Sequence, residues 1–425
     1  MNLLVVGGGG REHAIIKKLK ENPAVETVYA LPGNGGIAAD AVCVPEIGAK
    51  DIDGIVSFAQ SHAIDFAVVA PDDPLALGCV DKLHDIGIPC FGPDAKAARI
   101  EASKVFSKNL MRKYGIPTAD YQVFNDVAKA LDYLKDASFP IVIKADGLAL
   151  GKGVLIPTTY AEAEDAVRSI MEDKVFGASG NEIVIEEFLT GPEVSVLAFT
   201  DGTAIAPMVS SLDHKRAGDG DTGLNTGGMG TVAPNPYYTA AVAKECMETI
   251  FLPTLAAMRA EGCPFKGCLY FGLMITPRGP RVIEYNCRFG DPETQVVLPL
   301  LKTDLLTVMQ AVENETLADL TVEWHDGSAA CVILASGGYP SAYEKGKEMT
   351  IPAELPANVT VYHAGSALKD GMLVTAGGRV LGVTARAENL EQALTDAYAA
   401  ARQIHFDGVY MRNDIGQRAL AAGKG

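Results

Sequence analysis

The sequence predicts a multidomain protein of the α/β and α+β class, with an open parallel sheet at the N-terminus, a larger middle part and a small C-terminal α+β part. Three observations support this prediction. Residues 1–100 alternate short apolar runs with helical patterns, residues 101–325 change to strands of antiparallel type around glycine-rich loops, and residues 326–425 combine short strands with one strong helix. Alternation of strands and helices favours an open, mostly parallel sheet. A chain of 425 residues is long enough for several domains.

The first hundred residues alternate predicted strands and helices in a regular order. The strands are expected at 2–7, 27–32, 66–71 and 88–93, and the helices after the glycines at 7–10, at 51–63 and at 77–87. Each strand is a short apolar run, which suits a sheet that is covered on both faces.

The middle part begins with a predicted helix over 101–120 that stops at Gly115 and Pro117. Two strands within 139–157 then enclose a glycine-rich loop. A helix at 161–172, strands at 181–189, 190–202 and 203–215, a polar glycine loop at 218–230, a helix at 239–262 and a hairpin at 268–286 follow. After residue 326 the pattern predicts short strands near 361–365 and 372–385 and a helix at 389–404. The order predicts a separate small α+β domain at the C-terminus.

The charge and the cysteines exclude several classes of protein. The formal net charge is −17, which argues against nonspecific nucleic-acid binding because that requires a basic face. The eight cysteines form no C-x-x-C pair and no metal spacing with histidine, so we expect reduced, mostly buried thiols. No apolar run reaches the length of a membrane span. We therefore expect a cytoplasmic protein with no membrane or nucleic-acid partner.

The first glycine loop, GGGGREH, follows a strand and opens a helix, a position where backbone N–H groups bind phosphate. It does not fit the dinucleotide fingerprint, because Glu12 and His13 stand where the last glycine is needed. The end of the second strand also lacks the acid that binds the ribose of NAD. We interpret it as a phosphate site for another ligand, or as a tight strand-to-helix turn.

The second glycine loop, GLALGKGV, is not a P-loop, because only three residues separate its glycines and Gly153 follows Lys152. It lies between two strands, so we interpret it as a hairpin loop that closes over a triphosphate. Its predicted contacts are Gly151, Lys152 and Gly153. Lys144 on the preceding strand is expected beneath the phosphates, and Lys104 to join it. Lys104 alone would equally be a solvated helix lysine.

The segment IVIEEFLTGPEVSV is typical of a strand, a short hinge and a second strand. A hinge between two small sheets forms a slot for adenine, where main-chain groups meet the base and apolar side chains enclose it. The predicted ATP contacts here are Glu186, Glu187, Phe188, Leu189 and Glu193, the last for the ribose hydroxyls. The alternative for Glu186 and Glu187 is a charged pair on an edge strand.

The stretch EYNCRFGDPE places Glu284, Asn286 and Arg288 two residues apart. Alternate side chains of a strand share a face, so an acid, an amide and a guanidinium point the same way. Magnesium prefers hard oxygen ligands, few of them from protein in a phosphate site. Glu284 and Asn286 are therefore the predicted metal ligands, with Mg²⁺ or Mn²⁺ as the ion. Arg288, always charged and fork-shaped, suits a phosphoryl group.

Taken together, these segments resemble the ATP-grasp superfamily and, within it, the phosphoribosylamine–glycine ligase family. The resemblance covers essentially the whole chain and rests on VVGGGGREHA, LPGNGG, PLALGCVD, SKVFSK, IVIKADGLALGKGV, EEFLTGPEVS, DHKRAGDGDTGLNTGGMG and EYNCRFGDPE. It implies a Rossmann-like N-terminal domain over 1–100 that binds phosphoribosylamine. An ATP-grasp domain over 101–325, with a lid subdomain at 121–190, and a C-terminal domain over 326–425 would follow.

The resemblance also implies an activity and further site residues. The activity is ATP-dependent ligation of glycine to 5-phosphoribosylamine through glycyl phosphate, in purine biosynthesis, by a monomer or weak homodimer. Arg288, Asp291, Lys215 and Asp213 would be catalytic, with Asp291 orienting either Arg288 or the amine. The implied substrate contacts are Gly8, Gly9, Gly10, Asn34, Asp72, Asp213, Lys215, Asn225, Thr226, Gly227, Gly228 and Arg288. Asp72 stands where the family usually has glutamate, which shortens the reach of that carboxylate.

Three alternatives remain at this point. The chain could be an ATP-grasp ligase for a different acid, although the run from Asp213 to Gly230 argues against it. It could be a nicotinamide-dependent dehydrogenase, against which the missing glycine and ribose acid argue. It could also be a nucleotide-binding protein with a decayed site, but Lys144, Glu284, Asn286 and Arg288 are intact.

Overall fold

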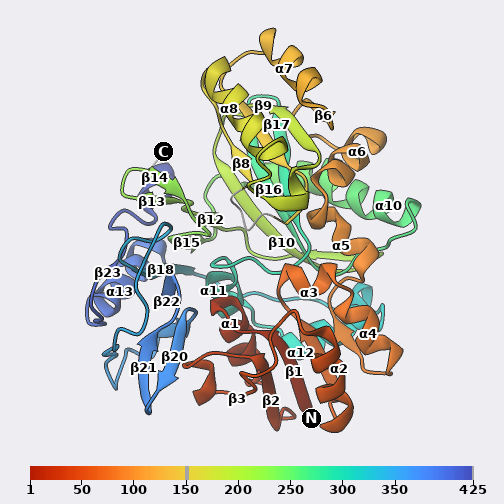
Figure 1. The fold of residues 1–425 in the computed structure, drawn as a ribbon. Coiled ribbons are helices and arrows are strands. Elements are labelled where there is room, and N and C mark those ends of the chain that lie inside the picture. Colours follow the sequence, from red (N-terminus) through yellow and green to blue (C-terminus); the bar gives the residue numbers. More distant parts are fainter. Residues whose placement is uncertain (149–152, 424–425) are drawn as a thin grey trace.

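The structure is a computed structural model that describes residues 1–148 and 153–423. It consists of a body built on three sheets and a smaller lobe that projects from it (Figure 1). The N-terminal sheet and the C-terminal sheet lie at one end of the body, and the projecting lobe, around β6 to β9, lies at the other. The predicted fold class is confirmed.

The N-terminal sheet has five parallel strands in the order β3-β2-β1-β4-β5, as the alternation of strands and helices predicted. Its strands are β1 (Asn2–Gly7), β2 (Thr27–Pro32), β3 (Val42–Cys43), β4 (Phe66–Val69) and β5 (Cys90–Phe91). The helices are α1 (Gly10–Leu19), α2 (Ile52–Ser61), α3 (Asp72–Ala76) and α4 (Cys79–Asp85). Both α1 and α3 begin beyond the carboxyl ends of parallel strands, the edge where open sheets bind ligands.

The predicted helix over 101–120 is two helices that meet at Ser103. Helix α5 (Ala95–Ala102) ends there, and the Ser103 side chain accepts a hydrogen bond from the Phe106 N–H as the cap of α6 (Lys104–Tyr114). Gly115 ends α6 with a φ of +68°, so the predicted stop is confirmed. The break turns α6 so that its first residue, Lys104, faces the projecting lobe.

The projecting lobe, which we call the lid, is a four-stranded sheet in the order β6-β9-β7-β8 with two helices. Its elements are β6 (Tyr121–Phe124), α7 (Val127–Lys135), β7 (Ile141–Ala145), β8 (Val154–Leu155), α8 (Tyr160–Met171) and β9 (Ile183–Glu187). The helices bury Leu134, Val167 and Ile170 against Ile143 and Ile185, which gives the lid a hydrophobic core of its own. A lobe with a separate core can move as a unit on its connections.

The central sheet is antiparallel, in the order β11-β10-β16-β17. Its strands are β10 (Glu193–Asp201), β11 (Ile205–Pro207), β16 (Lys266–Thr276) and β17 (Gly279–Asn286), and a bulge at Gly272/Leu273 shifts the register between β16 and β17. The predicted long helix after residue 239 is α9 (Ala240–Cys246), one π-helical turn (Met247–Phe251) and α10 (Leu252–Ala260). Phe271 and Val282 of this sheet share a core with Leu4 and Val6 of β1, so the central and N-terminal parts are packed together.

The C-terminal sheet has the order β12-β15-β18-β22-β19, with β23 paired to β18. Its strands are β12 (Leu212–Asp213), β15 (Gly230–Ala233), β18 (Ser328–Ser336), β19 (Val359–His363), β22 (Arg379–Ala387) and β23 (Val409–Tyr410). Two of them, β12 and β15, come from the middle part of the chain, so this sheet crosses the predicted boundary at residue 325. The domain limits themselves stay a prediction.

The remaining elements connect and cover these sheets. They are the helices α11 (Thr294–Val297), α12 (Leu305–Glu313), α13 (Leu390–Ala401) and α14 (Gln417–Ala422), and the hairpins β13 (Arg216–Gly218) with β14 (Thr222–Asn225) and β20 (Ser366–Lys369) with β21 (Met372–Thr375). The hairpin β13–β14 lies within the stretch that we expected to be an irregular polar loop.

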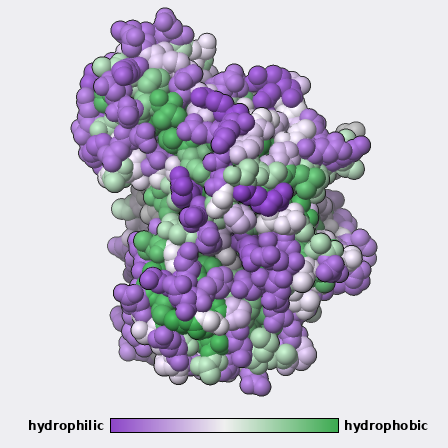
Figure 2. Space-filling model, turned by 90° about the vertical axis from the view of Figure 1, so that its right-hand side faces the viewer, coloured by the Kyte–Doolittle hydropathy of each residue, from purple (hydrophilic) through white to green (hydrophobic). Residues whose placement is uncertain are grey.

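The burial of the thiols agrees with the expectation from the sequence. The cysteines are free, and all but the half-buried Cys43 are buried. Hydrophilic residues cover most of the face shown in Figure 2, and hydrophobic ones appear in separate patches. Within 1–148 and 153–423, none of the helices has the length and apolar character needed to cross a bilayer.

Candidate active site

The strand β17 ends in the predicted metal ligands. Glu284 and Asn286 are half-buried on it. Glu284 lies opposite Gly272, where an added Cβ would come within 3.1 Å of the Glu284 Cγ, so glycine leaves room for this acid. The Glu284 carboxylate makes no hydrogen bond or ion pair with the residues that the structure describes, a state that suits a cation ligand. No cluster of three His, Cys, Asp or Glu side chains in the described ranges forms a ready-made metal site.

Arg288 is held by a carboxylate that the sequence did not reveal. Its Nη2 donates to Glu101 Oε1 at 3.0 Å and to Asn286 Oδ1 at 3.3 Å, while Glu101 Oε2 accepts the Cys287 N–H at 2.7 Å. Burial alone would lower the pKa of the Arg288 guanidinium, but the carboxylates of Glu101 and Asp72 raise it. Glu101 therefore fixes both the guanidinium and the backbone at the end of β17, and Asp72 lies near enough to act on the same charge.

Two lysines face each other across the junction of lid and body. Lys104 on α6 donates to the Gly147 carbonyl of the lid at 2.8 Å, and Lys144 on β7 of the lid donates to the Ile283 carbonyl of β17 at 3.0 Å. Burial lowers the pKa of Lys104, a shift that Glu284 opposes and Lys144 reinforces. The charges of Lys144 and Glu284 thus both act on Lys104, and the triphosphate site expected from the sequence stays a prediction.

Glu186 is not a charged pair on an edge strand. It is 3% exposed on β9, which lies between β6 and β7, and its oxygens lie 3.0 Å from Lys108 Nζ and 3.0 Å from Lys144 Nζ. Burial would raise the pKa of this carboxyl, but the two lysines lower it. Glu186 therefore joins α6 to the lid and positions Lys144; Lys108 was not recognised in the sequence.

The rest of the predicted ATP slot lies along the hinge after β9. Glu187 pairs with Arg278 at 2.8 Å, the Phe188 ring is 40% exposed and Leu189 is buried. Glu193 is the first residue of β10. Burial of its carboxyl and the nearby Glu284 and Asp213 raise its pKa, against the attraction of Lys215. Gly153 accepts the Ala145 N–H at 2.9 Å. Gly151 and Lys152 lie outside the described residues.

Lys215 connects two buried acids. Its Nζ lies 2.5 Å from Asp213 Oδ2 and 3.7 Å from Glu293 Oε1, and both carboxylates are almost fully buried. Burial would lower the pKa of Lys215, but Asp213 and Glu293 raise it well above its ordinary value. Tyr270 donates to Glu293 at 3.1 Å. The two acids thus fix the Lys215 ammonium at the edge of the site. Glu293 and Tyr270 were not among the residues predicted from the sequence.

The segment 225–228 is tied to Asp291 by Arg379 of β22. Arg379 Nη1 donates to the Asp291 carbonyl at 2.8 Å and to the Gly228 carbonyl at 3.4 Å, and Nη2 lies 3.6 Å from Asp291 Oδ1. At Gly228 φ is +127° and a Cβ would come within 2.7 Å of Asp213 Oδ1, so only glycine fits. Thr226 bonds to the Lys215 carbonyl at 2.8 Å, Gly227 N–H to Tyr339, and Asn225 is exposed.

Asp291 does not orient Arg288 in this structure. Its carboxylate accepts from Gln295 at 2.8 Å and from the Arg11 N–H at 3.4 Å, besides its contact with Arg379. Of the two roles expected for Asp291, orienting the amine of the substrate therefore stays a prediction.

The start of α1 lies beside Asp291. The Gly9 N–H donates to Glu12 at 2.5 Å, and a Cβ at Gly9 would lie 3.4 Å from Asp291 Oδ2. At Gly8 a Cβ would come within 2.3 Å of the Gly33 carbonyl, so the two loops touch through backbone. The Asn34 amide donates to the carbonyls of Gly8, His363 and Ala364, which makes its side chain a structural tie. Gly10 begins the helix and Asp72 begins α3, so both face the same edge of the sheet.

Family models match almost the whole chain. The N domain of phosphoribosylglycinamide synthetase matches residues 1–101, the ATP-grasp (A) domain 102–294 and the C domain 329–418. The chain belongs to the phosphoribosylglycinamide synthetase family. The resemblance inferred from the sequence is thereby confirmed, and the dehydrogenase alternative is excluded.

Individual relatives and a solved structure agree with this family assignment. A phosphoribosylamine–glycine ligase of Caldanaerobacter subterraneus is 46% identical over 98% of this chain and 99% of its own length. A bifunctional purine biosynthetic protein of Pichia angusta is 47% identical over 99% of this chain, which spans only 54% of that protein. The crystal structure of the Thermotoga maritima phosphoribosylamine–glycine ligase superposes with a TM-score of 0.86 at 35% identity, over 98% of this chain and all of the other.

A more distant likeness concerns the fold alone. A biotin carboxylase of Campylobacter jejuni superposes with a TM-score of 0.74 at 14% identity, over 96% of this chain and 92% of that one. The chain therefore shares its fold with that carboxylase. Family membership makes it an ATP-dependent ligase of purine biosynthesis.

Proposed function

We propose that the chain joins glycine to 5-phosphoribosylamine, with ATP as co-substrate, and releases glycinamide ribonucleotide, ADP and phosphate. The observation that supports this most is the strand end at 284–288. A free carboxylate, an amide oxygen and a fixed guanidinium follow each other there, next to the two lysines Lys104 and Lys144. Such an arrangement suits phosphoryl transfer, which depends on positioning and on neutralising charge.

The proposed reaction has two steps. A carboxylate oxygen of glycine attacks the γ-phosphorus of ATP, so that ADP leaves and glycyl phosphate forms. The amine of phosphoribosylamine then attacks the acyl carbon and expels phosphate, and that phosphate carries the oxygen that came from glycine. The amine loses a proton in this step.

Each step has candidate residues in this chain. Lys104 and Lys144 bind the phosphates, and Arg288 balances the charge of the transferred group. Glu284 and Asn286 fit Mg²⁺ or Mn²⁺, since Glu284 has no partner among residues 1–148 and 153–423 and Asn286 offers an oxygen. The metal would neutralise the nucleotide phosphates when bound. Asp213, Asp291 and the segment 225–228 are proposed to hold glycine and the amine, and Gly8 to Gly10 with Asp72 the phosphoribosyl end. We expect a cytoplasmic monomer or weak homodimer.

The experiment uses glycine labelled with ¹⁸O in its carboxylate. The enzyme is incubated with magnesium, ATP and phosphoribosylamine generated in the tube, and the products are analysed by mass spectrometry. We expect glycinamide ribonucleotide together with phosphate that carries one ¹⁸O. Unlabelled phosphate alongside product would rule out the acyl phosphate, and ADP release that needs a different acid would overturn the choice of glycine.

A further inference from the structure

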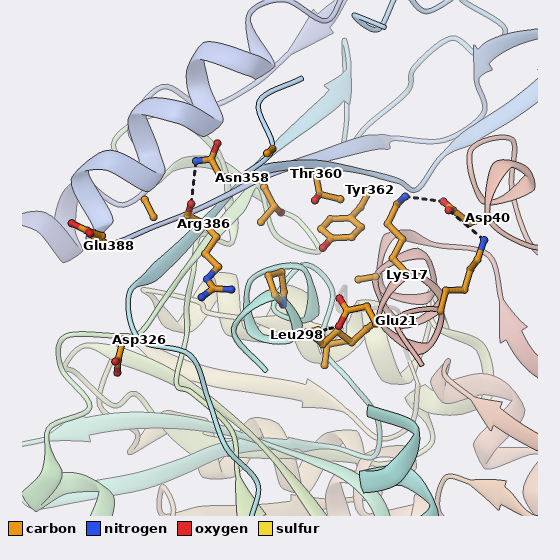
Figure 3. Close-up of a pocket in the computed structure, with 17 residues that line it drawn as sticks. Lys17, Glu21, Asp40, Leu298, Asp326, Asn358, Thr360, Tyr362, Arg386 and Glu388 are labelled. Atoms are coloured by element: carbon orange, nitrogen blue, oxygen red, sulfur yellow. Dashed lines mark hydrogen bonds and ion pairs between the residues drawn. The ribbon is translucent and has the colours of Figure 1, made fainter. Parts of the chain in front are cut away.

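A cavity of about 810 Å³ lies between α1 and the C-terminal sheet (Figure 3). Its walls are the second half of α1 with Lys17 and Lys18, the turn at Leu298, and the strands β19 and β22. Of the residues that the structure describes, none of those proposed above for ATP, glycine or the metal lines it. A cavity of this size accommodates a ligand as large as a nucleotide.

The sheet wall of the cavity is polar because of strand register. Thr360 on β19 pairs with Thr384 on β22, and Tyr362 pairs with Gly382, so alternate residues of both strands face α1. Thr384 is 2% exposed, and its Oγ1 has no hydrogen-bond partner among the residues described. A buried hydroxyl without a partner commonly marks a position where a water or ligand atom is bound.

One cation of the cavity has no carboxylate partner. Lys17 lies 2.8 Å from Asp40 and Lys18 lies 2.7 Å from Glu21, so these acids are neutralised within the protein. The Arg386 side chain makes no ion pair or hydrogen bond with the described part of the chain, although its backbone carbonyl accepts from Asn358. In Figure 3 the Arg386 side chain extends away from β22 on the opposite side of the cavity from Lys17 and Asp40, with two further acids, Asp326 and Glu388, at the edge.

The chemistry of these groups limits the ligand. A guanidinium only donates hydrogen bonds and stays charged, so its partner must offer acceptor oxygens and negative charge. The arginine fork matches the geometry of phosphate and of carboxylate. We propose that this cavity binds a small phosphate-bearing molecule through Arg386. The phosphate group belongs either to inorganic phosphate or to a nucleoside monophosphate.

The cavity is connected to the active site through each of its walls. Helix α1 begins at Gly10 beside Asp291, and β22 carries Arg379, the partner of Asp291, at its other end. The turn at Leu298 follows α11, which continues directly from Glu293. The walls of the cavity are thus joined to Asp291 by direct contacts.

The test measures binding in protein saturated with magnesium and ADP, so that the proposed nucleotide site is filled. Inorganic phosphate, AMP and adenosine are titrated separately by calorimetry, with thermal melting as a second readout. The variant is Arg386→Gln, and Arg386→Lys keeps the charge without the fork. Arg402→Gln is the control, because Arg402 lies over the Tyr398 ring on α13 and outside the cavity.

We expect AMP or phosphate to bind and to raise the melting temperature, with affinity at least tenfold weaker in Arg386→Gln, intermediate in Arg386→Lys and unchanged in Arg402→Gln. Phosphate as effective as AMP would identify the free anion as the ligand. The proposal would be overturned if neither AMP nor phosphate binds, or if they bind Arg386→Gln as tightly as the wild type. It would also be overturned if uncharged adenosine binds as tightly as AMP. The measurement needs no turnover, so its failure is separate from failure of the proposed ligase reaction.

Discussion

The contact between Glu101 and Arg288 gives the most specific prediction, Glu101→Gln. Glutamine keeps the size of the side chain and one acceptor for the Cys287 N–H, but it removes the charge that faces Arg288 Nη2 at 3.0 Å. Glu101 is 9% exposed, so solvent does not replace the lost partner. A hydrogen bond to a charged group contributes about 1.5–3 kcal/mol. If that energy holds Arg288 in its reactive position, kcat falls about 10- to 150-fold.

The assay compares ADP release, dependent on glycine and phosphoribosylamine, with the dissociation constant for ATP. We expect kcat to fall while ATP affinity stays unchanged, because Glu101 forms no hydrogen bond or ion pair with Lys104 or Lys144 within the described residues. The matched control is Glu172→Gln, which breaks an exposed pair with Arg168 on α8 and is expected to leave both quantities unchanged. A folded Glu101→Gln protein with normal kcat would show that Arg288 needs no charged partner and would refute this reasoning.

Three more predictions concern the metal ligand, the guanidinium and acid stability. Arg288→Ala is expected to keep ATP binding and lose most ligation; loss of ATP binding in a folded protein would place Arg288 elsewhere. Glu284→Ala is expected to raise the magnesium concentration needed for half-maximal rate and to lower turnover, and normal turnover would contradict its assignment as a ligand. Arg412, which lies 2.7 Å from Asp414, lowers the pKa of that carboxyl. The stabilisation from this contact is complete above about pH 4, the pKa of an aspartate in the unfolded chain, and it is lost as the pH falls below that value. Asp414→Asn should therefore lose less unfolding free energy than the wild type on acidification, as measured by urea denaturation at several pH values; parallel losses would contradict this.

The fold was predictable from local sequence, and so was the proximity of Glu284, Asn286 and Arg288 at the end of β17. Strand ends and glycine loops are short-range signals, and the two-residue spacing of Glu284, Asn286 and Arg288 places them together without knowledge of the tertiary structure. The break at Ser103 was missed because residues on both sides of it favour helix, and only the cap at Ser103 marks the end.

The residues that hold the site in place were not predictable. Glu101 lies 187 positions before Arg288, and Arg379 lies 88 positions after Asp291. Each is an ordinary charged residue on an ordinary helix or strand, and only the packing of the body brings it to its partner. Lys108 is a similar case, because an α6 lysine with a solvated face and one that binds Glu186 have the same sequence signature.

The hydrogen bonds of Lys104 and Lys144 have a consequence for nucleotide affinity. Both ammonium groups already bind carbonyl oxygens across the junction of lid and body. An incoming triphosphate must therefore compete with the protein's own oxygens, and the measured affinity is the difference between two sets of bonds. A change that weakens only the internal set would make the nucleotide bind more tightly, so a variant with higher ATP affinity need not have gained any contact with ATP.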